Sequence, residues 1–91
     1  MQTDGYVGRM YGIVQAAPHA VREASLELGS LADAVSTYRV ASIEFGPGCL
    51  AHLVIDDQVG GDRWGVFATT ELRAEDLERL AARISGARLM T

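Results

Sequence analysis

The chain of 91 residues contains no lysine and no asparagine, and all eight of its basic side chains are arginines. These arginines are scattered from Arg9 to Arg88 and form no basic stripe. Twelve acidic residues outnumber them, which gives a net charge of −4. Nucleic-acid-binding proteins neutralise phosphates with clustered cations. The charge pattern therefore argues against nucleic acid as a partner.

Cysteine and long apolar runs are equally scarce. Cys49 is the only cysteine, so the chain forms no internal disulfide, which is typical of proteins in a reducing compartment. No apolar run approaches the roughly 20 residues of a membrane-spanning helix. The first residues also lack the basic and apolar regions of a signal peptide. We therefore expect a cytoplasmic protein that does not enter a membrane.

The length of the chain indicates a single domain, residues 1–91, with a modest core. Hydrophobic residues make up 48% of the sequence, which is typical of a globular protein rather than a disordered one. A small domain with much apolar surface often gains stability by self-association. We therefore expect a folded domain that forms homodimers.

The first helix is predicted over residues 18–35. Proline suits the first turn of a helix, and Pro18 opens the segment. Apolar residues then follow at intervals of three and four, which places them on one helix face: Val21, Ala24, Leu28, Leu31 and Val35. Gly29-Ser30 interrupts the pattern, so two short segments with a kink are the alternative. We favour one helix because the apolar spacing continues unchanged through the break.

The second helix is predicted over residues 74–85. Its apolar residues form one stripe, and Glu75 and Asp76 in the first turn match the positive end of the helix dipole. Leu72 lies before the helix, where it can pack against an apolar residue of the second turn. Gly86 follows the last residue, as glycine often does at the end of a helix.

Three segments between the two helices have the composition of strands: residues 38–45, 49–56 and 63–70. In residues 49–56 the side chains on both faces are largely apolar, which is typical of a central strand covered on both sides. One cover is expected to be a helix, and the other a second helix or a second subunit. Residues 6–15 are apolar but interrupted by glycines, so the sequence does not decide whether they form a further strand.

These elements predict an α+β fold. An antiparallel sheet of three or four strands packs against two helices, in the order (β)-α-β-β-β-α. In the third strand Trp64 and Phe67 point to opposite faces, and we expect Trp64 to fill the core.

An acidic loop at residues 56–62 contains Asp56, Asp57 and Asp62 around a pair of glycines. Calcium loops place oxygen ligands at alternate positions and end with a glutamate, whereas here two aspartates are adjacent and the glutamate is missing. Phosphate-binding glycine loops lead into a helix, but this loop leads into a strand. We therefore favour a hairpin turn with solvated aspartates; weak binding of a divalent cation and contact with a partner are the alternatives.

Cys49 and His52 form a Cys-x-x-His pair, but residues three apart on a strand point to opposite faces. They cannot share a metal ion, and His52 cannot activate Cys49 as a nucleophile. The sequence also contains no catalytic triad, phosphate-binding loop, dinucleotide fingerprint or zinc motif. We therefore predict no catalytic residue, no cofactor and no metal site, and we favour a protein that is not an enzyme.

Several segments between residues 3 and 85 resemble the Roadblock family of the dynein light chain type. They are the helix AVREASLELGSLADAV, the strand pair VASIEFGPGCLAHLVID, the strand WGVFATT and the closing helix LRAEDLERLAARI. The family usually begins with a further helix and strand before the turn that here starts at Thr3. This chain departs from the pattern, because only Met1 and Gln2 precede that turn. The resemblance implies a non-catalytic dimer that docks small GTPases or larger assemblies, and no individual site residue is carried over.

The sequence thus favours a non-catalytic cytoplasmic module that self-associates and binds a protein partner. Its candidate partner contacts are Val21, Leu28, Leu31, Val35, His52, Asp56, Asp57, Asp62 and Trp64. One alternative is a small-ligand-binding or enzymatic domain with a pocket between helix and sheet near His52 and Trp64. Another is an accessory protein of a phage or mobile element that inhibits a host factor.

Overall fold

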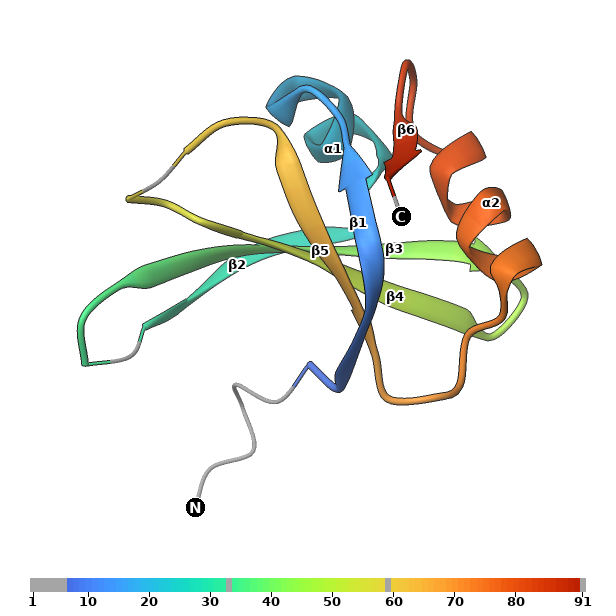
Figure 1. Cartoon of the computed structure of the whole chain (residues 1–91), viewed down its shortest axis with the longest axis horizontal. Helices are drawn as coiled ribbons and strands as arrows, with labels where there is room; N and C mark the ends of the chain where they lie inside the picture. Colours follow the sequence, from blue (N-terminus) through green and yellow to red (C-terminus); the bar gives the residue numbers. More distant parts are fainter. Residues whose placement is uncertain (1–6, 33, 59, 91) are drawn as a thin grey trace.

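The computed structural model describes residues 7–32, 34–58 and 60–90 and contains one six-stranded antiparallel sheet with two short helices (Figure 1). In chain order the elements are β1 (Arg9–Gln15), α1 (Pro18–Ala24), β2 (Glu27–Ala32), β3 (Thr37–Gly46), β4 (Cys49–Asp56), β5 (Arg63–Ala68), α2 (Ala74–Ala82) and β6 (Arg88–Met90). The strands lie side by side in the order β2-β3-β4-β5-β1-β6.

The predicted fold class, a sheet of three or four strands packed on two helices, is therefore wrong. The chain is mostly sheet, since β1, β2 and β6 join the three predicted strands. Residues 6–15, where the sequence alone does not decide whether a strand forms, contain the strand β1. It pairs with β5 on one side and with β6 on the other. β6 is only three residues long, and no periodicity can be recognised in so short a segment.

The long helix predicted over residues 18–35 is also wrong. α1 begins at Pro18 as predicted but ends after Ala24, because Ser25 has an extended backbone and its hydroxyl donates to the carbonyl oxygen of Arg22 at 2.9 Å. The chain then continues as β2, which pairs with β3 over six residues, from Glu27 opposite Ser42 to Ala32 opposite Thr37. Gly29-Ser30, where the alternative prediction placed a kink between two helical segments, therefore lies inside a strand.

The predicted strands and the second helix are confirmed with small shifts of their bounds. β3 and β4 form a long hairpin, and β5 pairs with both β4 and β1. α2 begins at Ala74 as predicted and ends at Ala82. Asp76 accepts the backbone N–H of Arg73 at its start, at 2.9 Å. Leu72 packs against the core cluster that contains Leu77, as expected for the residue before the helix.

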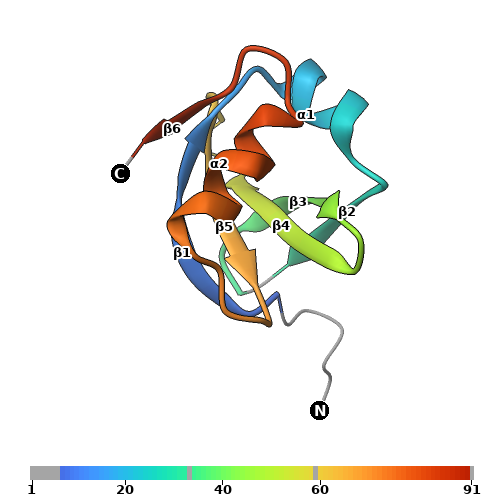
Figure 2. The same cartoon turned by 90° about the vertical axis from the view of Figure 1, so that its right-hand side faces the viewer.

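The core lies on one face of the strongly bent sheet, where β1 and β5 cross over β3 and β4 (Figure 1). Both helices cover this same face, as the view in Figure 2 also shows. Alternate residues of the strands meet them there, so the core contains Val14, Ala41, Ile43, Phe45, Ala51, Leu53, Trp64 and Val66 from the sheet with Ala20, Val21, Leu77 and Leu80 from the helices.

Within the described residues, no helix is long and apolar enough to cross a membrane. Both described helices cover one face of the sheet, and no described helix covers the other face.

Candidate functional site on the open face of the sheet

The open face is the side of the sheet opposite the helices. Because side chains alternate along a strand, the neighbours of the core residues point to this side. It is formed by Met10, Gly29, Leu31, Tyr38, Val40, Ser42, Leu50, His52, Val54, Gly65 and Phe67 together with Glu27. Most of these side chains are half-buried, while Met10 is 50% and Leu50 is 42% exposed.

A hydrogen bond joins β3 and β4 at the centre of this face. Ser42 and His52 are directly opposite each other in the strand register, and the distance from Ser42 Oγ to His52 Nδ1 is 2.9 Å. Glu27 of β2 lies opposite Ser42 on its other side. A carboxylate, a hydroxyl and an imidazole therefore lie in a row across three neighbouring strands.

The imidazole of His52 is half-buried, and this burial lowers its pKa below the ordinary value of 6.5 because the charged form loses solvation. The nearby carboxylate of Glu27 opposes this change and raises the pKa, but desolvation is the larger cause. The neutral form of His52 is therefore favoured at neutral pH, with one ring nitrogen able to accept the hydroxyl hydrogen of Ser42.

A cavity of about 310 Å³ opens beside this row of polar groups. Its walls come from Val7, from β2 and from the middle of β3 and β4, and it is lined by Glu27, Leu28, Gly29, Ser30, Leu31, Val40, Ser42 and His52. Its lining combines polar side chains of Glu27, Ser30, Ser42 and His52 with apolar side chains of Val7, Leu28, Leu31 and Val40. The cavity is thus shaped for a small amphipathic group rather than for an apolar one.

An aromatic platform continues the open face next to His52. Phe67 is the direct register partner of His52, and its ring lies across Gly65, where an added Cβ would be only 2.9 Å from a ring carbon. The methyl of Met10 lies on the same glycine, at 3.5 Å from that position. The side chains of Phe67 and Met10 therefore cover Gly65 and occupy the space that a side chain at this position would fill.

The titration of His52 predicts a pH-dependent stability. When the pKa of a histidine is lower in the folded than in the unfolded chain, the unfolded chain binds the proton more readily. The contribution to stability is therefore fully present above the pKa of the unfolded chain and is lost as the pH falls through the folded pKa. We expect the free energy of unfolding, measured with urea, to decrease between pH 7.5 and 5.5, and His52→Gln to remove part of this decrease. His19→Gln is the matched control, because His19 is exposed. An equal pH dependence in the His52 variant and in the wild type would contradict the assignment.

The acidic loop at residues 56–62 is a hairpin turn, as favoured from the sequence. Gly60 and Gly61 have φ values of +71° and +93°, which suit glycine, and the N–H of Gly60 donates to the carbonyl oxygen of Asp56 at 2.9 Å. Val59 of this loop lies outside the described residues.

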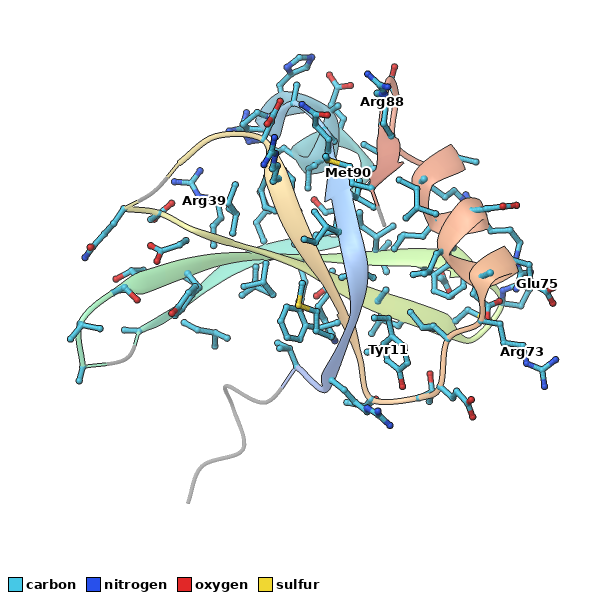
Figure 3. The ribbon with its side chains drawn as sticks, in the orientation of Figure 1. Tyr11, Arg39, Arg73, Glu75, Arg88 and Met90 are labelled. Carbon is cyan, nitrogen blue, oxygen red and sulfur yellow. The ribbon has the colours of Figure 1, made fainter. Side chains whose placement is uncertain are left out.

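Each aspartate of this loop has a structural partner. Asp56 accepts the backbone N–H of Gln58 at 2.8 Å, and Asp62 accepts the side-chain amide of Gln15 at 3.1 Å. Asp57 pairs with Nε of Arg39 at 3.1 Å, where Figure 3 labels Arg39 on the hairpin near the loop between β4 and β5. Both partners of this ion pair are exposed, so it contributes little to stability.

The described part of the chain has no group of three or more histidine, cysteine, aspartate or glutamate residues that could hold a metal ion. Cys49 packs against the core cluster and lies at an irregularity of the β3–β4 pairing, away from His52 on the open face. The prediction that these two residues do not act together agrees with this geometry.

The remaining predicted contact residues are separated by the fold. Val21 and Trp64 are core residues with 0% and 2% exposure, and the indole N–H of Trp64 donates to the carbonyl oxygen of Ala16 at 3.1 Å. Trp64 and His52 lie on opposite faces, so a single pocket between helix and sheet does not contain both. Leu28 and Val35 are exposed, and Leu31 is half-buried beside the cavity.

Sequence reasoning identified His52 but missed Glu27, Ser42, Phe67 and Met10, the other members of the site. Alternation placed Ser42 on one side of its strand, but only the register of three strands brings it between Glu27 and His52. Glu27 lies within the segment predicted as the first helix, so the sequence did not place it in the sheet.

Comparisons with known proteins give no family for this arrangement: no protein-family model, no curated protein and no solved structure matches the chain.

Proposed function

We propose that this chain is a non-catalytic, cytoplasmic interaction module that self-associates through the outer edge of β2. The observation that carries the proposal is an edge strand with exposed leucines: Leu26 just before it is 65% exposed and Leu28 within it is 44% exposed. No other described strand pairs with this edge. The chain has a single cysteine and so forms no internal disulfide, which supports the proposed location in a reducing compartment such as the cytoplasm.

Edge strands carry unpaired N–H and C=O groups that recruit another strand, and most proteins protect them with lysine, proline, a bulge or a short length. β2 contains none of these residues, and its only charge is Glu27 at its beginning. The opposite edge is β6, which has only three residues. β2 is therefore the edge that best accepts a second strand, and a second copy of β2 supplies one of equal length.

The geometry of antiparallel pairing limits where the two copies can meet. Residues that lie directly opposite each other in an antiparallel pair point to the same face of the sheet, so core-facing residues of one copy must pair with core-facing residues of the other. This holds only if the two-fold axis passes through a residue rather than between two residues. Gly29 and Ser30 are the two central residues of β2. A symmetric pairing therefore joins five of the six residues of β2 and brings either Gly29 or Ser30 close to its own copy.

We expect light scattering to give twice the mass of one chain at micromolar concentration. In a Cys49→Ser background, single cysteines at Gly29→Cys and Ser30→Cys test the contact, because a residue on the two-fold axis forms a disulfide with its own copy under mild oxidation. Glu78→Cys, on the exposed surface of α2, is the matched control. We expect one of the two β2 variants to form covalent dimers much faster than this control.

A monomeric mass at every concentration would refute self-association itself. A doubled mass with no cross-linking above the control rate at either position would leave the dimer standing but refute its placement on β2.

The Roadblock resemblance implies a dimeric, non-catalytic module, and the small-GTPase or assembly partner that it implies stays a prediction. Residues 20–35, which resemble one helix of that family, contain most of α1 followed by β2 in the structure, so this segment does not support the resemblance. The exposed leucines of β2 and of the open face supply the apolar area that protein contacts use.

A further inference from the structure

Beyond self-association, we propose that the cavity on the open face binds a small molecule with one ammonium group and an apolar body, with the ammonium against Glu27 and Ser42. The combination of one carboxylate, one neutral hydrogen-bonding pair and apolar walls around about 310 Å³ carries this proposal. This volume lies at the lower end of the range of small-molecule sites.

The charge of the cavity selects a cation. Among its described lining residues Glu27 is the only acidic side chain, and no arginine contributes to the walls. Arg39, on the neighbouring part of β3, is on the other side of the sheet, where it pairs with Asp57. An anionic ligand would therefore meet the Glu27 carboxylate without a compensating charge, whereas a cation gains an ion pair.

The hydrogen bond between Ser42 and His52 provides a second acceptor. When the Ser42 hydroxyl donates to Nδ1 of neutral His52, its oxygen keeps lone pairs that can accept a hydrogen from the ligand. An ammonium group has three donors and no acceptor. Glu27 on one side and Ser42 on the other thus match two of these donors, and His52 acts as a positioning residue for Ser42.

The apolar walls receive the rest of the ligand. Leu31 and Val40 lie on neighbouring strands of the open face, and Val7 borders the cavity from the segment before β1. These side chains are partly exposed, so an apolar group placed against them removes their surface from water. An amine with a short aliphatic or aromatic body fits this combination of walls and charges.

The test uses 2-phenylethylamine as the probe and the full chain labelled with ¹⁵N. We expect saturable shifts of the amide signals of Ser42 and His52 in the millimolar range. The uncharged analogue 2-phenylethanol has the same body without the cation, and we expect its binding to be weaker by about tenfold or more, the loss expected for a charge-assisted hydrogen bond.

Glu27→Gln should weaken amine binding to the level of the alcohol, whereas Glu71→Gln, an exposed control outside the cavity, should leave it unchanged. The proposal is overturned if the amine gives no saturable shifts at these residues, if amine and alcohol bind equally, or if Glu27→Gln binds the amine like the wild type. Should Glu27→Gln not fold, the comparison of amine and alcohol on the wild type decides alone.

Discussion

Replacing Trp64 with alanine is expected to lower the free energy of unfolding by about 3–5 kcal/mol, the range for a buried tryptophan. Trp64 is the largest fully buried side chain and packs in the centre of the core. A domain of this size has a total stability of only about 5–15 kcal/mol. The variant should therefore lose a large part of its stability and unfold at a clearly lower urea concentration, which circular dichroism during urea denaturation would measure.

Trp64→Phe separates the two contributions of this residue. Phenylalanine keeps most of the apolar area but removes the indole N–H that donates to the carbonyl oxygen of Ala16, and an unsatisfied buried acceptor costs about 1–3 kcal/mol. Leu50→Ala is the control on the open face, where 42% exposure predicts a much smaller loss. A Trp64→Ala variant as stable as Leu50→Ala would contradict the central position of Trp64 in the core.

The second large effect is expected from Gly8→Ala, just before β1. Gly8 has a φ of +96°, which an L side chain rarely adopts, and an added Cβ would lie 1.9 Å from the carbonyl oxygen of Ala68. The strained backbone and the forced separation of β1 from the end of β5 are each unfavourable. Together they should reduce the free energy of unfolding by roughly 2–5 kcal/mol.

Gly12→Ala is the matched control, since it makes the same change inside β1 itself. An added Cβ at Gly12 meets only the side chain of Leu77 at 3.6 Å, an ordinary contact, so we expect a change within about 1 kcal/mol. Denaturation curves of the two variants compare these positions directly. Equal stability of Gly8→Ala and Gly12→Ala would show that the close approach to Ala68 is absent in solution.

The parts of the fold that the sequence predicted are those governed by local signals. Pro18 marks the start of α1, the acidic first turn marks α2, and alternation identifies β4 with Trp64 and Phe67 on opposite faces of β5. These features depend on neighbours a few residues away, so they can be recognised without the rest of the chain.

The parts that the sequence did not predict depend on distant partners. Leu28 and Leu31 have helical spacing, yet in β2 they point to opposite faces, because pairing with β3 is more favourable than continuing a helix through Gly29. Glu23 and Glu27 repel at helical spacing, and this signal would have argued against the long helix. The candidate site needed the register of β2, β3 and β4, which no local pattern contains.

The position of β1 in the sheet affects how the chain folds. β1 pairs with β5 on one side and with β6 on the other, so its pairing can be completed only when β6 has been synthesised. Contacts between such distant segments require the closure of long loops, which slows folding. During synthesis β2, β3 and β4 can form a hairpin sheet early, with Leu28 and the open face uncovered. The sheet is completed only after residues 88–90 have left the ribosome, whereas the β2 edge is accessible to a second chain as soon as this early sheet forms and stays unpaired among the described strands of the complete fold.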